Sequence, residues 1–118
     1  MIRPILACED PYHAAKKFVN AGWKLDFSQP PESGDPLVGV SLYGNSILLG
    51  ITDGYVANDG KEHLGCGVEI YLTIPSALME EVHKNHCGLH PTNMELQPWG
   101  VYAFEVFIES YKFMIAAE

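Results

Sequence analysis

MELQPWGVYAFEVFIESYKFMIAAE, the stretch from Met94 to Glu118, constrains the architecture of the chain more than any other part of it. A turn signal at residues 97–100 precedes two apolar-rich runs, residues 101–107 and 111–117, which predict two strands joined by a tight connection. One polar residue interrupts each run, Glu105 in the first and Lys112 in the second. One face of this hairpin is therefore expected to meet a core, and the other to meet water or a ligand.

The first half of the chain predicts the order strand, helix, strand, strand, strand. A short apolar run at residues 2–8 is followed by Asp10 and Pro11, which suit the N-cap and first position of a helix. Residues 23–27 predict the next strand. Two further runs flank Gly44-Asn45, a pair typical of a hairpin turn.

The second half repeats this order after a polar, glycine-rich stretch at residues 53–64. Residues 66–74 predict a strand, Pro75-Ser76 opens a helix that extends through Val82, and a short strand precedes the closing hairpin. The pattern indicates an internal duplication. We predict an α+β fold in one domain, residues 1–118, with two βαβββ modules at 1–52 and 65–118 joined by the loop 53–64.

Bulk composition narrows the possible partners. The 118 residues suffice for one domain, and the formal charge of −8 disfavours direct nucleic-acid binding while favouring cationic small molecules. No apolar run is long enough to cross a membrane and no secretory signal pattern precedes Pro4, so we expect a cytoplasmic protein without a membrane partner. The three cysteines are too few and too scattered for a disulfide framework and predict reduced, mostly buried thiols.

Several short motifs, in order and at suitable intervals, resemble the vicinal-oxygen-chelate superfamily, which includes glyoxalase I, extradiol dioxygenases and bleomycin-resistance proteins. They include Glu9-Asp10 before the first helix, Ser76-Ala77-Leu78 at the second, and Gln97-Pro98-Trp99-Gly100. The last motif is similar to the same segment of the bleomycin-resistance group. The resemblance implies curved mixed sheets around a cavity, commonly in a homodimer.

The resemblance also implies four metal-ligand positions, which match Arg3, Leu49, Gly67 and Met114 here. None is an ordinary ligand for a divalent cation, and a slip in register would add only Glu69. His83 and His86 at a helix end, followed by His90, suggest metal only superficially, because the helix dipole accounts for them. We therefore expect no metal and no cofactor.

The candidate ligand-binding residues are carboxylates and aromatics. Alternation along residues 67–74 places Glu69 and Tyr71 on one face, either toward the cavity or toward solvent. Glu105 converges on the same space in this interpretation, and Trp99 suits a stacking wall or a dimer contact. Arg3 could pair with an anionic ligand group or with Glu118. The full candidate set is Glu69, Tyr71, Trp99, Glu105, Tyr43, Met114 and Arg3.

One departure from the family pattern leaves a side-chain orientation open, and three functions are compatible with the sequence. The family's usual Asp-Pro-Asp-Gly turn is replaced by residues 107–110, FIES, which predicts a bulkier turn and leaves open which of Phe104 and Glu105 faces inward. The favoured function is a small-molecule-binding protein that sequesters a drug-like or cationic ligand without a metal. The alternatives are a metal-dependent, glyoxalase-like lyase or isomerase and the ligand-sensing domain of a regulator. No nucleophile-elbow or phosphate-binding motif supports other chemistry.

Overall fold

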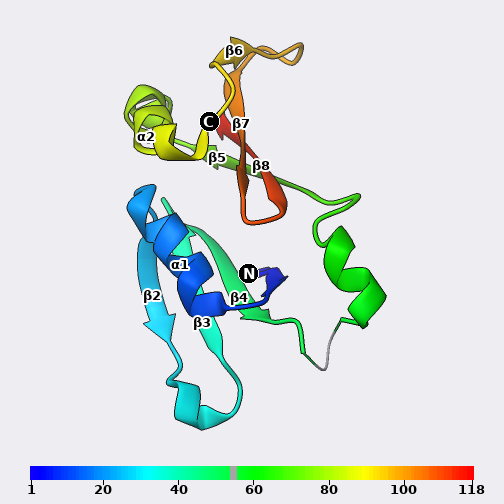
Figure 1. Cartoon of the computed structure of the whole chain (residues 1–118). Coiled ribbons are helices and arrows are strands. Elements are labelled where there is room, and N and C mark those ends of the chain that lie inside the picture. The colour runs from blue at the N-terminus through cyan, green and yellow to red at the C-terminus, as the bar shows by residue number, and fades with distance from the viewer. Residues whose placement is uncertain (54–55) are drawn as a thin grey trace. The chain divides into compact units, whose positions relative to one another are not determined.

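A computed structural model describes residues 1–53 and 56–118, and divides them into two compact units, Met1–Leu64 and Gly65–Glu118. Each unit contains one four-stranded mixed sheet with an α-helix (Figure 1). The α+β class and the repeated βαβββ order predicted from the sequence are confirmed, because both sheets have the strand order first, fourth, third, second.

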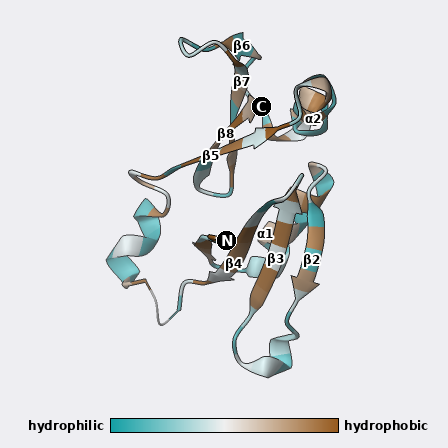
Figure 2. Cartoon of the chain, turned by 180° about the vertical axis from the view of Figure 1, so that it is seen from behind, coloured by the Kyte–Doolittle hydropathy of each residue, from teal (hydrophilic) through white to brown (hydrophobic). Residues whose placement is uncertain are grey.

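The first unit contains the strands β1 (Ile5–Cys8), β2 (Lys24–Ser28), β3 (Leu37–Leu42) and β4 (Asn45–Ile51), with helix α1 (Pro11–Asn20) and the 3-10 turns η1 (Pro31–Ser33) and η2 (Asn58–His63). β1 pairs parallel with β4, whereas β3 pairs antiparallel with both β4 and β2. Hydrophobic colour runs along β3 and β4 in Figure 2, in keeping with strands that sit in the middle of the sheet.

The helix α1 begins and ends as its sequence predicts. The Asp10 side chain accepts hydrogen bonds from the backbone N–H groups of Tyr12 and His13, and Pro11 occupies the first turn. Gly22 follows the helix with φ of 96°. Phe18 is fully buried and meets Trp23 edge to face at 5.1 Å, which fixes the helix on the sheet.

The first hairpin turns one residue earlier than predicted. Its loop is Tyr43-Gly44, with φ of 45° and 86°, and Asn45 is already the first residue of β4. Two successive positive φ values are characteristic of a type I′ turn, whose backbone matches the twist of the flanking strands. Gly44-Asn45 as the turn pair was therefore wrong, because the glycine takes the second loop position.

The predicted loop 53–64 contains the 3-10 turn η2, and the Lys61 ammonium lies 2.7 Å from the Asp53 carboxylate. Residues 54 and 55 of that predicted loop lie outside the described residues.

The second unit contains the strands β5 (Glu69–Ile74), β6 (Glu95–Leu96), β7 (Tyr102–Ile108) and β8 (Tyr111–Ala117), with helix α2 (Met79–Asn85) and the 3-10 turns η3 (Ser76–Leu78) and η4 (Cys87–Leu89). β5 pairs parallel with β8, as β1 does with β4. The second unit therefore reproduces the topology of the first.

The closing hairpin is tight, as the two apolar runs predict, whereas the bulkier turn expected from residues 107–110 was wrong. Ile108 pairs with Tyr111, and the two-residue loop is closed by Glu109 in the left-handed conformation at φ of 58°. This register also decides which of Phe104 and Glu105 faces α2, a choice that the sequence left open. Phe104 is buried against the rings of His83 and His86, on the α2 side of the sheet.

The thiols are less buried than predicted. None of the three cysteines forms a disulfide; Cys8 is buried in the first sheet, but Cys66 and Cys87 are exposed because they lie in the connections before β5 and after α2. None of the helices in the described residues has the length and apolarity needed to cross a bilayer.

Candidate ligand-binding site

The face of the second sheet opposite α2 carries most of the predicted ligand-binding residues. Residues that pair in register share a face, so the pairs Glu69–Lys112, Tyr71–Met114 and Glu105–Met114 bring three strands together there. We call this surface the polar face. It consists of Glu69, Tyr71, Thr73, Ala103, Glu105, Phe107, Lys112, Met114 and Ala116.

An aromatic pair stands on the polar face. Trp99 Nε1 donates a hydrogen bond of 3.2 Å to the Tyr71 hydroxyl, and the two ring centroids are 6.2 Å apart at an interplanar angle of 56°. Both side chains are about half exposed. The loop that carries Trp99 is closed by a 2.8 Å hydrogen bond from Gln97 N to Val101 O and by Gly100 at φ of 94°. The indole is therefore held in place while its ring stays accessible.

A small apolar floor lies in the same surface. Met114, Ala103 and Ala116 form a buried cluster, and Val101 packs against it. The Val101 contact links the Trp99 loop to the sheet.

Three charged side chains lie on the polar face next to this floor. Lys112 Nζ is 3.1 Å from Glu105 Oε2, and Glu69 occupies the register position beside Lys112 on β5. The hydrogen bond to Glu105, the charge of Glu105 and then that of Glu69 raise the pKa of Lys112. The ammonium thus stays charged at neutral pH, and the group retains one uncompensated negative charge.

Comparisons with solved structures show the same fold over the whole chain. TioX from Micromonospora sp. ML1 is 17% identical with a TM-score of 0.74, covering 100% of this chain and 95% of TioX. A member of the glyoxalase/bleomycin resistance protein/dioxygenase superfamily from Sphaerobacter thermophilus is 21% identical with a TM-score of 0.72, covering 100% of this chain and 97% of that chain. The chain has the vicinal-oxygen-chelate fold.

A bleomycin-binding protein complexed with bleomycin has the vicinal-oxygen-chelate fold as well. It is 11% identical to this chain with a TM-score of 0.71, covering 100% of this chain and 98% of its own. No protein-family model and no curated protein matches the sequence.

The residues matched to the metal positions of the vicinal-oxygen-chelate fold do not form a ligand set. Leu49 was misplaced, because it is fully buried and pairs with Leu6 and Val38 in the core against α1. Arg3 precedes β1 and Gly67 precedes β5, which leaves Met114 as the one matched residue within a strand of the polar face.

The donors that are present also do not suit a metal ion. Across the described residues, no three His, Cys, Asp or Glu side chains are grouped closely enough to hold one. The two carboxylates of the polar face already flank an ammonium group. His83 Nε2 is 2.8 Å from the Thr92 carbonyl oxygen, and His86 Nδ1 is 2.8 Å from that of Val82, so both rings are engaged in structural contacts.

Two of the predicted residues belong to the first unit. Tyr43 is exposed in the hairpin turn, and Arg3 lies near the N-terminus with Nε 3.3 Å from Met1 Sδ. Their part in ligand binding stays a prediction.

Sequence reasoning missed Lys112 and Thr92. Lys112 was visible as a polar residue of the closing hairpin on the same face as Glu105, its diagonal neighbour across the two strands, and the alternation of that hairpin was sufficient to find it. Thr92 had no signal, because it lies outside any strand; its hydroxyl accepts a 2.8 Å hydrogen bond from Glu105 N, and its own N–H donates to Glu105 O. Thr92 therefore fixes the backbone that presents Glu105.

Proposed function

We propose that this chain is a small-molecule-binding protein of the glyoxalase/bleomycin-resistance type that sequesters a drug-like or cationic organic ligand on the polar face, without a metal. We further propose that it acts as a cytoplasmic homodimer. The observation that carries the proposal is the half-exposed Tyr71–Trp99 pair, held by its hydrogen bond next to the Glu69–Lys112–Glu105 group.

The aromatic pair provides the contact area. Large rings that are already ordered bind a planar or cationic ligand at little cost in conformational entropy. Trp99 is ordered by its hydrogen bond to Tyr71, and Phe107, exposed on the same face, extends the apolar surface.

The charged group provides selectivity for a cation. Two carboxylates and one ammonium leave a net negative charge, and the second unit as a whole has seven acidic and two basic side chains. A cationic ligand is therefore attracted to this surface, while an anionic one is repelled. The bleomycin complex of a protein with this fold supports choosing a cationic glycopeptide as the first ligand to test.

Calorimetric titration of the chelator-treated protein with metal-free bleomycin tests the proposal. We expect saturable binding, and about a fivefold weaker affinity in Trp99→Ala, since a cation–aromatic contact is worth about 1 kcal/mol. Leu96→Ala is the matched control, because Leu96 is another large exposed apolar residue of this unit outside the polar face. Absence of binding, or equal affinities in Trp99→Ala and Leu96→Ala, would contradict the proposal.

Two further measurements separate sequestration from catalysis. The ligand should be recovered chemically unchanged after incubation, as judged by its mass. Elemental analysis of the purified protein should find no stoichiometric zinc, nickel or iron; finding one would favour the lyase or isomerase alternative instead.

A further inference from the structure

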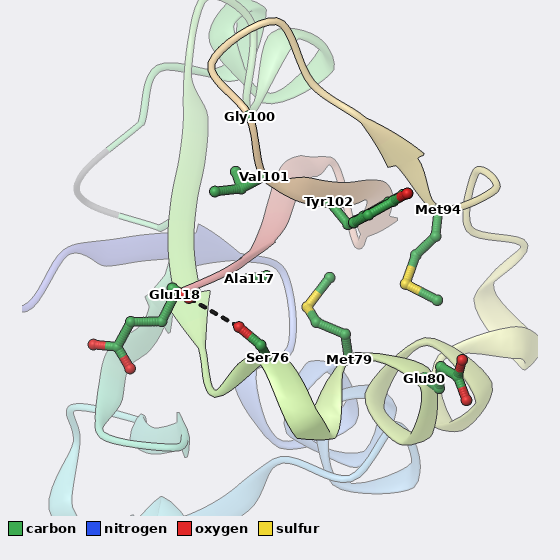
Figure 3. Close-up of a pocket in the computed structure, with 9 residues that line it drawn as sticks. All are labelled: Ser76, Met79, Glu80, Met94, Gly100, Val101, Tyr102, Ala117 and Glu118. Atoms are coloured by element: carbon green, nitrogen blue, oxygen red, sulfur yellow. Dashed lines mark hydrogen bonds between the residues drawn. The ribbon is translucent and has the colours of Figure 1, made fainter.

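The second unit has a pocket of about 460 Å³ on the α2 side of its sheet, away from the polar face. It is lined by Ser76 and the start of α2, by residues 100–102, which lead into β7, by Met94, and by the last two residues of the chain at the end of β8 (Figure 3). None of the seven residues predicted from the sequence to bind ligand lines it. A volume in this range suits a small organic molecule.

The interior of this pocket is apolar and adaptable. In Figure 3 the side chains of Met79, Met94 and Tyr102 extend toward one another across the pocket. Ala117 leaves room beneath them, since its methyl group is the only side chain that β8 contributes at this point. Thioether side chains reshape around a ligand and make favourable contacts with aromatic rings, so this interior favours an aromatic guest.

One charged group at the rim has no partner among the residues that the structure describes. Glu80 lines the pocket and is exposed, and its carboxylate forms no hydrogen bond or ion pair with any residue in the described ranges 1–53 and 56–118. The Ser76 hydroxyl, by contrast, already donates a 2.9 Å hydrogen bond to Glu118 O, and Figure 3 shows the Glu118 side chain pointing away from the pocket. The carboxylate of Glu80 is thus the group available to pair with a positive charge on a ligand.

We infer that this pocket is a second small-molecule site, which binds a compact ligand with an aromatic body and a cationic amine. The body is enclosed by Met79, Met94 and Tyr102, and the amine lies next to Glu80. The Tyr102 and Ala117 side chains of this site lie on the opposite face of the sheet from Met114. Val101 is shared, because it lines the pocket and also packs against the apolar floor of the polar face.

The four methionines allow a test in which the two sites report separately. Met79 and Met94 line the pocket, Met114 belongs to the polar face, and Met1 lies at the chain terminus. The protein is labelled at its methionine methyl groups and titrated with benzyltrimethylammonium chloride, followed by NMR. A ligand of this size is expected to bind with Kd of about 1–10 mM. Saturable shifts of the Met79 and Met94 methyl signals, without comparable shifts of Met1, support the inference.

Two charge variants test the role of Glu80. Glu80→Gln should weaken binding of the probe about two- to fivefold, the range of an exposed ion pair. The matched control Glu81→Gln should not weaken it, because Glu81 is an exposed neighbour that does not line the pocket. Phenylacetate, which carries the opposite charge on a similar body, should bind more weakly than benzyltrimethylammonium.

Three results would overturn the inference. They are unshifted Met79 and Met94 signals up to about 10 mM probe, equal affinities of the two glutamate variants, or shifts confined to Met114. The last result would place the cation on the polar face and would support the function proposed there, so failure of one site does not imply failure of the other.

Discussion

His86 is a buried titratable side chain that acts on stability. It is fully buried at the end of α2, with Nδ1 2.8 Å from the Val82 carbonyl oxygen and its ring against Phe104 at a centroid distance of 5.9 Å. Burial lowers the pKa of His86 below its usual 6.5; the hydrogen bond to Val82 opposes this effect, and His83 adds to it. The folded protein therefore favours the neutral ring.

We predict that the free energy of unfolding decreases as the pH falls below 6.5. In that range the unfolded state binds a proton at His86 that the folded state does not, until the pH reaches the lower pKa of the folded protein. The slope contributed by one such group is at most about 1.4 kcal/mol per pH unit. Urea unfolding at a series of pH values measures it.

A variant at His86 isolates the contribution of this side chain to the pH dependence of stability. His86→Asn should have a shallower pH dependence than the wild type over the same range, whereas His13→Asn, at an exposed position of α1, should keep the wild-type slope. Equal slopes in His86→Asn and the wild type would show that the acid sensitivity originates elsewhere.

Two glycines at the start of the second unit, Gly65 and Gly67, allow a matched test of how the segment before β5 contributes to stability. Both have positive φ, 83° and 76°, so alanine strains the backbone at either position. A Cβ at Gly65 would also overlap the Ser110 carbonyl oxygen, whereas at Gly67 no atom lies within 4 Å. The turn between β7 and β8 thus lies directly against Gly65.

We predict that Gly67→Ala destabilises the protein by about 1 kcal/mol, the cost of the left-handed conformation. Gly65→Ala should cost a further 1–3 kcal/mol, roughly, because it forces the Ser110 backbone to move. Chemical denaturation of the two variants measures the difference. If Gly65→Ala is no worse than Gly67→Ala, the contact with Ser110 is not structurally important.

The repeated strand and helix pattern was predictable from sequence because alternation and capping are local properties. Asp10 and Pro11 marked the start of α1, and alternation along β5 correctly placed Glu69 and Tyr71 on one face. The residue pair of the first hairpin turn and the bulk expected at the second were wrong, because Tyr43 and Glu109 adopt left-handed conformations that their residue types do not favour. There the pairing of the flanking strands outweighs the local preference.

Parts of the candidate site depended on contacts that local patterns do not encode. The Tyr71–Trp99 hydrogen bond joins residues 28 positions apart, and the ion pair of Lys112 depends on the register of the closing hairpin. Leu49 was assigned to the wrong face because a register error of one residue reverses every side chain of a strand. The α2-side pocket needed side-chain positions and had no sequence signal.

The whole chain exposes many large apolar side chains for a protein of 13.1 kDa. Besides the aromatics of the polar face, Ile2, Ile5 and Val68 are more than half exposed. Where exposed apolar side chains gather into one patch, they typically mark a surface that associates with another protein.

We therefore predict a homodimer in solution, with a mass twice that of the 13.1 kDa chain. Sedimentation velocity over a range of protein concentrations measures this mass directly. Ile5→Glu, which puts a charge on an exposed apolar strand position, should shift the distribution toward monomer, while Lys24→Glu, already polar and exposed, should not. A monomer at all concentrations would contradict the prediction.

The ammonium group of Lys112 influences which ligands can bind to the polar face. An incoming cation competes with a tethered one, whose effective concentration is on the order of millimolar or higher because it cannot diffuse away. A simple amine with one positive charge gains little binding free energy by replacing the Lys112 ammonium next to the carboxylates. The protein should consequently select ligands by their number of positive charges and by their size. It should bind polycationic molecules large enough to cover the rings of Tyr71 and Trp99, and should not bind small cellular amines.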